Sequence, residues 1–326
     1  MKNILLIGGT YFLGKAFVRL MQGVPDARLT LLHRGSGNNP ETDMRRSDTA
    51  PEGIAIAEGE KTDSGKGSSV REILIDRHDT AALKQIPHEY FDAVIDFCAY
   101  AKGDIVSLLE NINADIGQYI FISTSDVYMR GLGKWLKEDA PLETRAFGGA
   151  AGEYISGKVS LEEEIAGACK KKGCEYTVLR PVFIFGPDNY APRESMYFHW
   201  INAAGQILHP ADAEGEFQLV YAGDVADSIK LVIGNPESYG KAFNICKNDL
   251  YTYDRFAELL KESIDTPFQR VDTDVATVNE KGIPLPFPLT KAESNYYDGT
   301  AIKELGLKYT DDVKAMRETY KSYNKN

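Results

Sequence analysis

A glycine-rich turn directly after an apolar run constrains the fold of this chain more than any other feature. The run is Ile4–Ile7, and the turn that follows is Gly8-Gly9-Thr10-Tyr11-Phe12-Leu13-Gly14. Apolar residues at helical spacing come next, within Lys15–Met21. A short, wholly apolar run fits a strand that is buried on both faces of a parallel sheet. The turn therefore predicts a connection from a buried strand to a helix.

Each part of this turn has an expected role in holding an anion. We expect Gly8 to permit a tight turn and Gly14 to let the helix pack closely on the strand. The helix N-terminus would present N–H groups of Thr10, Phe12 and Leu13 and a partial positive charge to a pyrophosphate. Tyr11 stands where such turns usually have their middle glycine, so its side chain must point away from the pyrophosphate or cover it.

Strands and helices are predicted to alternate through the first half of the chain. Further strands fit Arg28–Leu32, Glu72–Ile75, Ala93–Phe97, Tyr119–Ile122 and Tyr176–Leu179, and helices fit Asp104–Asn111 and Tyr154–Lys170. This alternation indicates an α/β fold with a doubly wound parallel sheet of the Rossmann type. Ligands of such sheets bind outside the carboxyl ends of the strands.

Two segments depart from this alternation. Residues 35–69 are rich in Gly, Ser, Asp and Glu and are long for a connection, which predicts a surface insertion. After Gly186 the pattern becomes irregular, which predicts a smaller C-terminal substrate lobe. We expect residues 1–186 plus 220–235 to form the dinucleotide-binding domain, and 187–219 plus 236–326 to form the substrate-binding lobe.

Composition narrows the classes of partner. The net charge of −11, from 37 basic and 48 acidic residues, argues against a broad phosphate-binding surface, so nucleic acid is not an expected partner. The four cysteines show no metal-binding or disulfide spacing, and we expect inert thiols and no metal site. No apolar stretch approaches the roughly 20 residues that a bilayer-spanning helix needs. A cytoplasmic protein with a small-molecule substrate is the expectation.

The end of the second strand bears on the choice of cofactor. An acidic residue there would bind the ribose of NAD, whereas a basic residue would accept the 2′-phosphate of NADP. This chain has His33 and Arg34 at that position, and the guanidinium of Arg34 suits a phosphate. NADP(H) is therefore favoured, although NAD(H) stays an option if Arg34 only stacks on adenine. Asp76, after the third strand, is placed to reach the adenine amino group.

Tyr154 and Lys158 form the main candidate for chemistry. Their spacing of four residues puts a phenol and an ammonium on one face of a helix. Leu161 and Ile165 continue that stripe, so we expect the face to look inward and the cation to lower the pKa of a buried Tyr154. Such a tyrosine can take a proton from a substrate hydroxyl. A tyrosine–lysine pair on a surface helix is the alternative interpretation.

A run of hydroxyl side chains follows the fifth predicted strand. It reads Ser123-Thr124-Ser125-Asp126-Val127-Tyr128, at the sheet edge where ligands bind. Thr124 or Ser125 could donate a hydrogen bond to a substrate oxygen. A cluster that caps the start of a turn is the alternative.

These elements stand in the order found in one large family. The sets Gly8–Gly14, Ser123–Tyr128 and Tyr154–Lys158 together resemble the short-chain dehydrogenase/reductase superfamily, in its extended NAD-dependent epimerase/dehydratase branch. The segments Leu179-Arg180-Pro181 and Phe185-Gly186-Pro187 extend the resemblance toward the substrate lobe. The non-glycine at the middle of the turn is similar to atypical members related to chloroplast stem-loop-binding proteins.

The resemblance implies an activity and a set of residue roles. It implies an oxidoreductase or epimerase that transfers hydride at a hydroxyl or carbonyl of a sugar-like substrate, with a nucleotide sugar as one option. Tyr154 would be the catalytic base, Lys158 would bind the nicotinamide ribose, and Thr124, with Ser125 as its neighbour, would hold the substrate oxygen. The family also suggests a homodimer through the helix that carries Tyr154.

A function of a different class stays open at this point. The atypical turn would also fit a non-catalytic, dinucleotide-binding regulatory or RNA-interacting protein. Lys170-Lys171-Lys172 is the basic triplet that such a protein would use. The acidic balance of the chain and the intact Tyr154 and Lys158 pair favour the enzyme.

Overall fold

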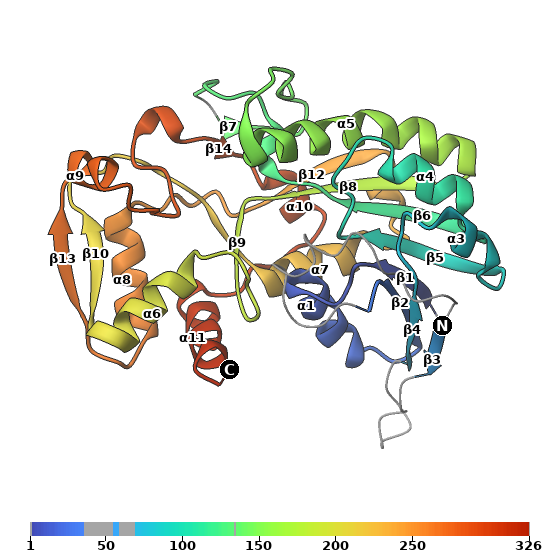
Figure 1. The fold of residues 1–326 in the computed structure, drawn as a ribbon, viewed down its shortest axis with the longest axis horizontal. Coiled ribbons are helices and arrows are strands. Elements are labelled where there is room, and N and C mark those ends of the chain that lie inside the picture. The colour runs from blue at the N-terminus through green and yellow to red at the C-terminus, as the bar shows by residue number, and fades with distance from the viewer. Residues whose placement is uncertain (1, 36–54, 59–68, 134, 326) are drawn as a thin grey trace. The chain divides into compact units, whose positions relative to one another are not determined.

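Figure 1 shows the computed structural model, which describes residues 2–35, 55–58, 69–133 and 135–325. These residues form two compact units. The first comprises Met1–Val127, Leu142–Arg180 and Ala226–Phe243, and the second comprises Tyr128–Pro141, Pro181–Val225 and Asn244–Asn326. The domains predicted from the sequence are defined by function, as a dinucleotide-binding domain and a substrate-binding lobe. A division into compact units does not test these functions, so the predicted domain boundaries stay a prediction.

The first unit is built on an eight-stranded sheet. Its strands run in the order β12-β8-β6-β5-β1-β2-β4-β3. Their bounds are β1 Lys2–Ile7, β2 Ala27–His33, β3 Ala55–Glu58, β4 Ser69–Leu74, β5 Glu89–Asp96, β6 Ala114–Ile122, β8 Glu175–Pro181 and β12 Lys241–Ile245. The pairs from β4 through β2, β1, β5 and β6 to β8 are parallel, and β3 is antiparallel to β4. The prediction of a doubly wound Rossmann sheet is confirmed.

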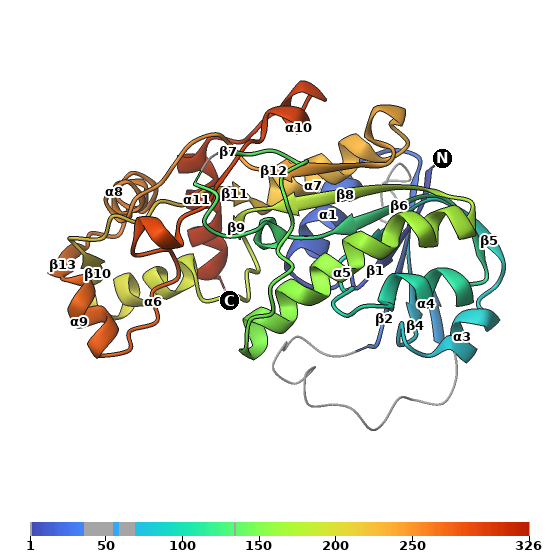
Figure 2. The ribbon, with the colours of Figure 1, turned by 90° about the horizontal axis from the view of Figure 1, so that it is seen from above.

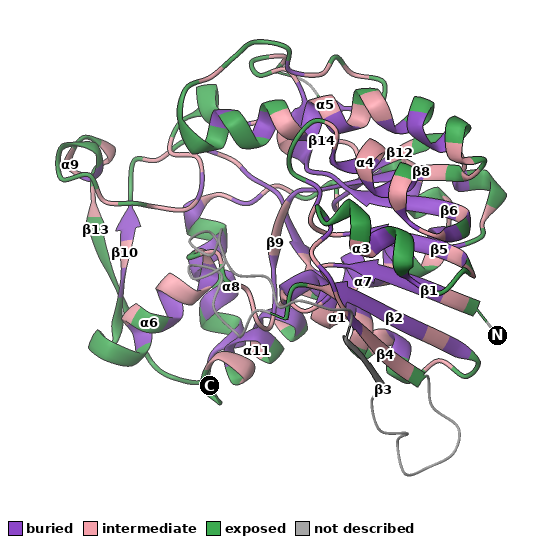
Figure 3. Ribbon diagram, turned by 45° about the vertical axis from the view of Figure 1, so that its right-hand side comes forward, coloured by how far each residue is buried: buried purple, intermediate pink, exposed green. Residues whose placement is uncertain are grey.

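Helices cover both faces of this sheet. Figures 1 and 2 show α3 (Thr80–Gln85), α4 (Asp104–Asn111) and α5 (Gly149–Lys172) along one face, and α1 (Phe12–Gln22) and α7 (Ala222–Val232) along the other. Residues of α3, α4 and α5 share one core cluster with residues of β1, β5 and β6. Figure 3 shows that these strands are buried along most of their length, as their apolar runs predict. The strand order reverses between β1 and β5, which makes their carboxyl ends the expected ligand edge.

Short elements complete the second unit. Its helices are α6 Glu194–Ala204, α8 Tyr253–Ser263, α9 Val275–Glu280, α10 Thr300–Glu304 and α11 Asp312–Tyr323. Three parallel two-stranded pairs join β10 Gln206–Pro210 to β13 Gln269–Thr273, β9 Phe183–Phe185 to β11 Leu219–Tyr221, and β7 Trp135–Leu136 to β14 Tyr296–Tyr297. Single 3-10 turns lie at Ser125–Val127 and Pro236–Ser238 in the first unit, and at Lys291–Glu293 in the second. The core of the second unit is aromatic, with the rings of Phe217 and Phe287 stacked 4.0 Å apart.

Several elements were not predicted, among them α6 and β3. The sequence after Gly186 looked irregular, yet α6 forms there and buries Tyr197, Phe198 and Ile201. Aromatic and polar residues alternate closely in α6, which hides the helical period. Strand β3 lies within the predicted insertion at 35–69, where it pairs with β4. The remainder of that insertion, residues 36–54 and 59–68, lies outside the described residues.

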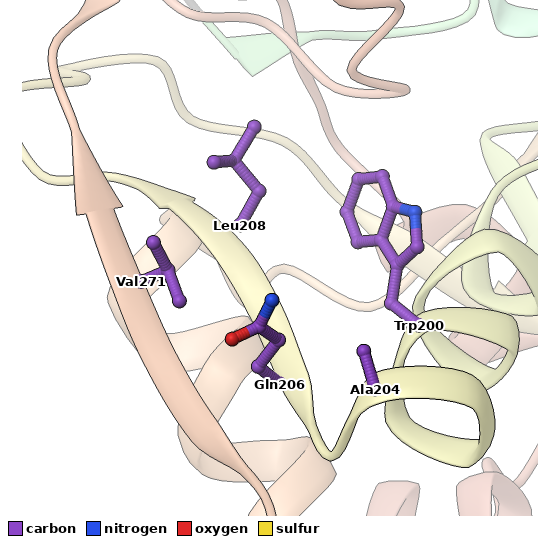
Figure 4. Close-up of a pocket in the computed structure, with 5 residues that line it drawn as sticks. All are labelled: Trp200, Ala204, Gln206, Leu208 and Val271. Carbon is purple, nitrogen blue, oxygen red and sulfur yellow. The ribbon is translucent and has the colours of Figure 1, made fainter.

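A shallow apolar pocket of about 170 Å³ lies within the second unit, as Figure 4 shows. Its walls come from α6, β10 and β13, and the lining residues are Trp200, Ala204, Gln206, Leu208 and Val271. It contains none of the predicted site residues, and no carboxylate or cation lines it. The predicted site residues lie instead toward the carboxyl ends of the strands of the first unit.

Candidate active site

The glycine turn has the geometry that the sequence suggests. Gly8 has a φ angle of +78°, and a Cβ at this position would lie 2.7 Å from Sγ of Cys98, the second residue after β5. A side chain is therefore excluded twice, by backbone conformation and by space. A Cβ on Gly14 would lie 2.5 Å from Cα of Gly9. Gly14 therefore lies closely against Gly9 of the turn. The sequence predicted that Gly14 would let the helix pack closely on the strand.

The start of α1 is suited to an anion through its backbone. Tyr11 is the N-cap residue in an extended conformation, and the first turn of α1 carries no acidic residue. The side chains of Phe12 and Leu13 are buried, so only their backbone N–H groups can face a ligand. Thr10 is half-buried. The helix N-terminus therefore offers N–H groups and a partial positive charge without a competing carboxylate.

The predicted adenosine residues lie together at the ends of β2 and β4. Nη1 of Arg34 lies 3.9 Å from Oδ2 of Asp76, and both side chains are partly exposed. Oδ1 of Asp76 accepts a hydrogen bond from the backbone N–H of His78 at 2.9 Å. The same oxygen lies 3.1 Å from Nδ1 of the His78 ring. Nδ1 of His33 accepts a hydrogen bond from the N–H of Gly35 at 3.1 Å. His33 therefore supports its own turn, and Arg34 and Asp76 are the side chains presented here.

Tyr154 and Lys158 lie in the first half of α5 with very different surroundings. The side chain of Tyr154 is exposed, with 37% of its surface accessible, whereas Lys158 is only 2% accessible. Nζ of Lys158 donates a hydrogen bond to the backbone oxygen of Ile122 at 2.8 Å, and it lies 5.8 Å from the ring centroid of Tyr154. The prediction that this whole face is buried is correct for Lys158 and wrong for Tyr154, because Tyr154 sits near the start of the helix, beyond the strands that cover Lys158.

The ammonium of Lys158 is held in an aromatic surrounding. The ring centroids of Phe121 and Tyr100 lie 4.7 Å and 4.9 Å from its Nζ. Burial lowers the pKa of Lys158 to about 8, although the carboxylate of Asp96 raises it. Aromatic faces stabilise a cation, so the charge survives at neutral pH in a place with little water. A lysine with this pKa changes protonation within the range where enzymes work.

The hydroxyl run provides a cap for the turn that follows it. Thr124 and Ser125 are both buried, and Oγ1 of Thr124 accepts a hydrogen bond from the N–H of Asp126 at 3.2 Å. Thr124 thus caps the 3-10 turn that follows, which was the alternative interpretation of this run. A hydroxyl that accepts one hydrogen bond can still donate another, so a role toward a substrate oxygen stays a prediction for Thr124 and Ser125.

An ion pair that the sequence did not single out fixes α5 on the sheet. Nε of Arg180, in β8, lies 3.1 Å from both carboxylate oxygens of Glu162, one turn beyond Lys158 in α5. Oγ of Ser123 donates to the same carboxylate at 2.5 Å. All partners are almost fully buried. The contact from Lys158 to β6 and the contacts from Glu162 to β8 and Ser123 together set the position of the helix.

Tyr100 also lies at this edge of the sheet and was not predicted as a site residue. Its ring is 49% accessible, and its centroid lies 6.3 Å from that of Tyr154. The carboxylate of Asp104 accepts hydrogen bonds from the N–H groups of Tyr100 and Ala101, at 2.9 and 3.0 Å. The signal was present, since Tyr100 follows the predicted strand Ala93–Phe97 at the ligand edge of the sheet.

Gly157 allows the Tyr100 loop to lie directly on α5. A Cβ on Gly157 would stand 1.9 Å from the backbone oxygen of Tyr100, so Gly157→Ala must displace that loop. We expect this variant to lose about 1–3 kcal/mol of unfolding free energy, as overpacked cores do. Gly167, in the same helix, has nothing within 4 Å, and Gly167→Ala should gain about 0.5–1 kcal/mol from helix propensity. Urea denaturation measures both, and a stabilised Gly157→Ala variant would contradict the described contact.

A buried charged cluster lies at the end of β5, next to the glycine turn. Nη1 of Arg77 donates to both oxygens of Asp96, at 2.8 and 2.9 Å, and the hydroxyl of Tyr119 also donates to Asp96. The backbone N–H of Cys98 donates to the same carboxylate at 2.9 Å. Burial raises the pKa of the Cys98 thiol to about 12. Cys98 is therefore a neutral group that packs under Gly8.

The family follows from a comparison of the whole chain with protein-family profiles. The profile of the NAD-dependent epimerase/dehydratase family matches residues 4–246, which include the glycine turn, the hydroxyl run, Tyr154 and Lys158. This chain belongs to the NAD-dependent epimerase/dehydratase family. The resemblance stated from the sequence motifs is therefore confirmed.

The chain is also similar to an individual chloroplast protein. The chain is 28% identical, over 260 residues, to the chloroplast stem-loop binding protein of 41 kDa b of Arabidopsis thaliana. The aligned part spans 79% of this chain but only 62% of that relative. The similarity to stem-loop-binding members agrees with the atypical turn at Tyr11.

Solved structures show the fold. A UDP-glucose 4-epimerase from Thermotoga maritima, solved with UDP-glucose, has a TM-score of 0.70 at 18% identity, with 99% of each chain covered. A dTDP-glucose 4,6-dehydratase from Bacillus anthracis, solved with NAD, has a TM-score of 0.67 at 17% identity, covering 100% of this chain and 97% of the other. At these identities the likeness concerns the fold alone.

Two structural features are absent from the described part of the chain. None of its helices combines the length and the apolar character that crossing a membrane requires. Among the same residues, no group of three or more His, Cys, Asp or Glu side chains is arranged to hold a metal ion.

Proposed function

We propose that this protein is an NAD(P)-dependent oxidoreductase or epimerase that acts by hydride transfer on a sugar-like hydroxyl or carbonyl substrate, with nucleotide sugars as the first class to test. One observation carries the proposal. The exposed phenol of Tyr154 lies beside the buried ammonium of Lys158, at the sheet edge that also carries the glycine turn. Membership of the NAD-dependent epimerase/dehydratase family supports the same reaction class.

The residues present fit a nicotinamide dinucleotide. The glycine turn and the carboxylate-free start of α1 would hold the pyrophosphate, with contacts from the turn residues Gly8, Thr10, Tyr11, Phe12, Leu13 and Gly14. Arg34 and Asp76 would hold the adenosine end, and Lys158 the nicotinamide ribose. When bound, the nicotinamide supplies the hydride acceptor and donor that no side chain can provide.

The chain's own groups would move the proton and fix the substrate. The positive charge of Lys158 favours the phenolate of Tyr154, which takes the proton of the substrate hydroxyl. The hydroxyl of Thr124, or that of Ser125, would donate a hydrogen bond to the substrate oxygen and hold it in place. The ring of Tyr100 positions Lys158 through its contact with the ammonium.

The cofactor choice rests on Arg34. We expect Arg34→Ala to weaken NADPH binding by about 10-fold or more, because a charge-assisted hydrogen bond to a phosphate is worth about 1.5–3 kcal/mol. NADH binding should change by less than about threefold, since its ribose carries no phosphate for the guanidinium. Titration of the protein with each cofactor, followed by nicotinamide fluorescence, measures both. Equal weakening of both cofactors by Arg34→Ala would remove the preference for NADP(H).

A second candidate is favoured by the relative that is named for stem-loop binding. Under this second candidate function, the protein would bind a dinucleotide and a structured RNA without catalysing a reaction. Two of the three lysines at the end of α5 are engaged within the protein, since Lys171 pairs with Glu110 at 2.7 Å and Lys172 donates to the oxygen of Ile112 at 3.1 Å. Tight binding of an RNA hairpin at moderate salt would favour this candidate.

The oligomeric state is proposed separately. A homodimer through α5 is the expectation carried from the family resemblance. Light scattering during size-exclusion chromatography distinguishes a monomer from a dimer.

A further inference from the structure

Two cysteines meet where α5 ends. The helix stops at Lys172, and Gly173 adopts a left-handed conformation with a φ angle of 80°. The N–H groups of Gly173 and Cys174 both donate to the backbone oxygen of Cys169, at 2.8 and 3.0 Å. This C-terminal cap brings the side chain of the residue after the glycine against the residue one turn earlier. Here both of those residues are cysteines.

The two cysteines are neighbours at this cap, because the backbone N–H of Cys174 is bound to the backbone oxygen of Cys169. Cys169 is 1% accessible within the core of the first unit, and the half-buried Cys174 packs against the same core. Inert thiols are expected from the sequence, and all four cysteines are free, but the sequence pattern did not single out this pair. The spacing of four intervening residues hid it, because only a helix that ends between the two cysteines closes the gap.

The pKa values of the two thiols are shifted in opposite directions. The hydrogen bond from Cys169 lowers the pKa of the Cys174 thiol, with the ammonium of Lys172 adding to the effect, and it raises the pKa of Cys169. Cys174 is thus the half-exposed thiol that ionises more easily, and Cys169 is the buried thiol that holds its proton. By contrast, burial raises the pKa of Cys246, as it does for Cys98. A nucleophilic thiol beside a second thiol is the arrangement of a redox-active dithiol.

We propose that Cys169 and Cys174 form a dithiol that a low-molecular-weight disulfide, of the oxidised glutathione type, converts into an intramolecular disulfide. The thiolate of Cys174 attacks one sulfur of the reagent, whose S–S bond breaks and releases one glutathione thiolate. The sulfur of Cys169 then attacks Sγ of Cys174, and its proton passes to the second glutathione as that leaves. The two protein thiols are oxidised, and one reagent disulfide is reduced to two thiols. The dithiol uses none of the residues of the proposed function, so neither depends on the other.

The test is exposure of the full chain to oxidised glutathione, followed by alkylation and mass spectrometry. The expected product has lost two hydrogens and carries no glutathione. Trypsin cuts after Lys170, Lys171 and Lys172, so the peptides with Cys169 and Cys174 stay joined only through a disulfide. We expect this pair to react about tenfold or more faster than Cys98 or Cys246, following its thiolate character and exposure.

Three variants make the result specific. Cys174→Ser should abolish the loss of two hydrogens, and Cys169→Ala should stop the reaction at a stable glutathione adduct on Cys174. Cys98→Ser with Cys246→Ser should leave the disulfide intact. Because Cys174 is half-buried, its serine variant is the one that should fold without difficulty. A wild-type chain that only accumulates adducts, or a disulfide that persists in Cys174→Ser, would overturn the proposal.

Discussion

Replacing Tyr154 by phenylalanine is expected to lower turnover by a factor of about 10²–10⁴, the contribution of a positioned general base, while the cofactor Kd changes by less than about threefold. The substitution removes one hydroxyl from a ring that is 37% accessible, so the packing of α5 should not change. Lys158 keeps its hydrogen bond to Ile122 and its aromatic neighbours, and with them the contact proposed for the ribose. The measurement is kcat for hydride transfer together with a cofactor titration on the same preparation.

A matched control is available at the opposite edge of the sheet. Tyr90 is the second residue of β5 and is 55% accessible, so Tyr90→Phe removes the same hydroxyl from an exposed ring far from the ligand edge in the strand. Its turnover should equal that of the wild type. If Tyr154→Phe were as active as Tyr90→Phe, Tyr154 would not be the base.

Replacing Lys158 by methionine is expected to change activity and stability in opposite directions. Turnover should fall by about 10² or more, because the phenolate of Tyr154 loses its neighbouring cation. The folded protein should gain about 1–3 kcal/mol of unfolding free energy at neutral pH. Burial lowers the pKa of Lys158 from 10.5 to about 8, and each pKa unit corresponds to roughly 1.4 kcal/mol of cost for the buried ammonium. The variant also loses the hydrogen bond to Ile122, which reduces this gain in unfolding free energy by about 1 kcal/mol.

The sign of the pH dependence follows from the same shift. Between pH 8 and 10.5 the unfolded chain still binds the lysine proton that the folded chain has released, so wild-type stability rises with pH. The advantage of Lys158→Met should therefore be largest at pH 7 and should shrink toward pH 10. Urea denaturation at the two pH values tests this. A variant less stable than the wild type at pH 7 would show that Lys158 contributes stability through its contacts.

The sheet could be predicted because its strands contain short apolar runs that alternate with stretches able to form helices. The predicted helix Asp104–Asn111 agrees with α4 at both ends, and the run Ile4–Ile7 lies within β1. Glycine positions were equally informative, since Gly8 has both a left-handed conformation and a side chain directly against it. These features are local, or depend on one neighbouring strand.

The parts that could not be predicted depend on tertiary contacts. The exposure of Tyr154 and the burial of Lys158 depend on where the strands end under α5, which spacing along one helix does not give. The pairing of Glu162 with Arg180 joins a helix to a strand that follows it in the chain. The contact of Cys169 with Cys174 needed a helix end at Lys172, and helix ends are the least certain feature of a sequence pattern.

The most direct test of the central claim is to mix the NAD(P)⁺-loaded protein with a panel of UDP- and dTDP-hexoses and record the absorbance of reduced nicotinamide. We predict that at least one sugar produces the reduced cofactor with the wild type and none does so with Tyr154→Phe. A wild-type protein that binds the cofactor but reduces none of it with any sugar, or a Tyr154→Phe variant that reduces it equally fast, would contradict the proposed function.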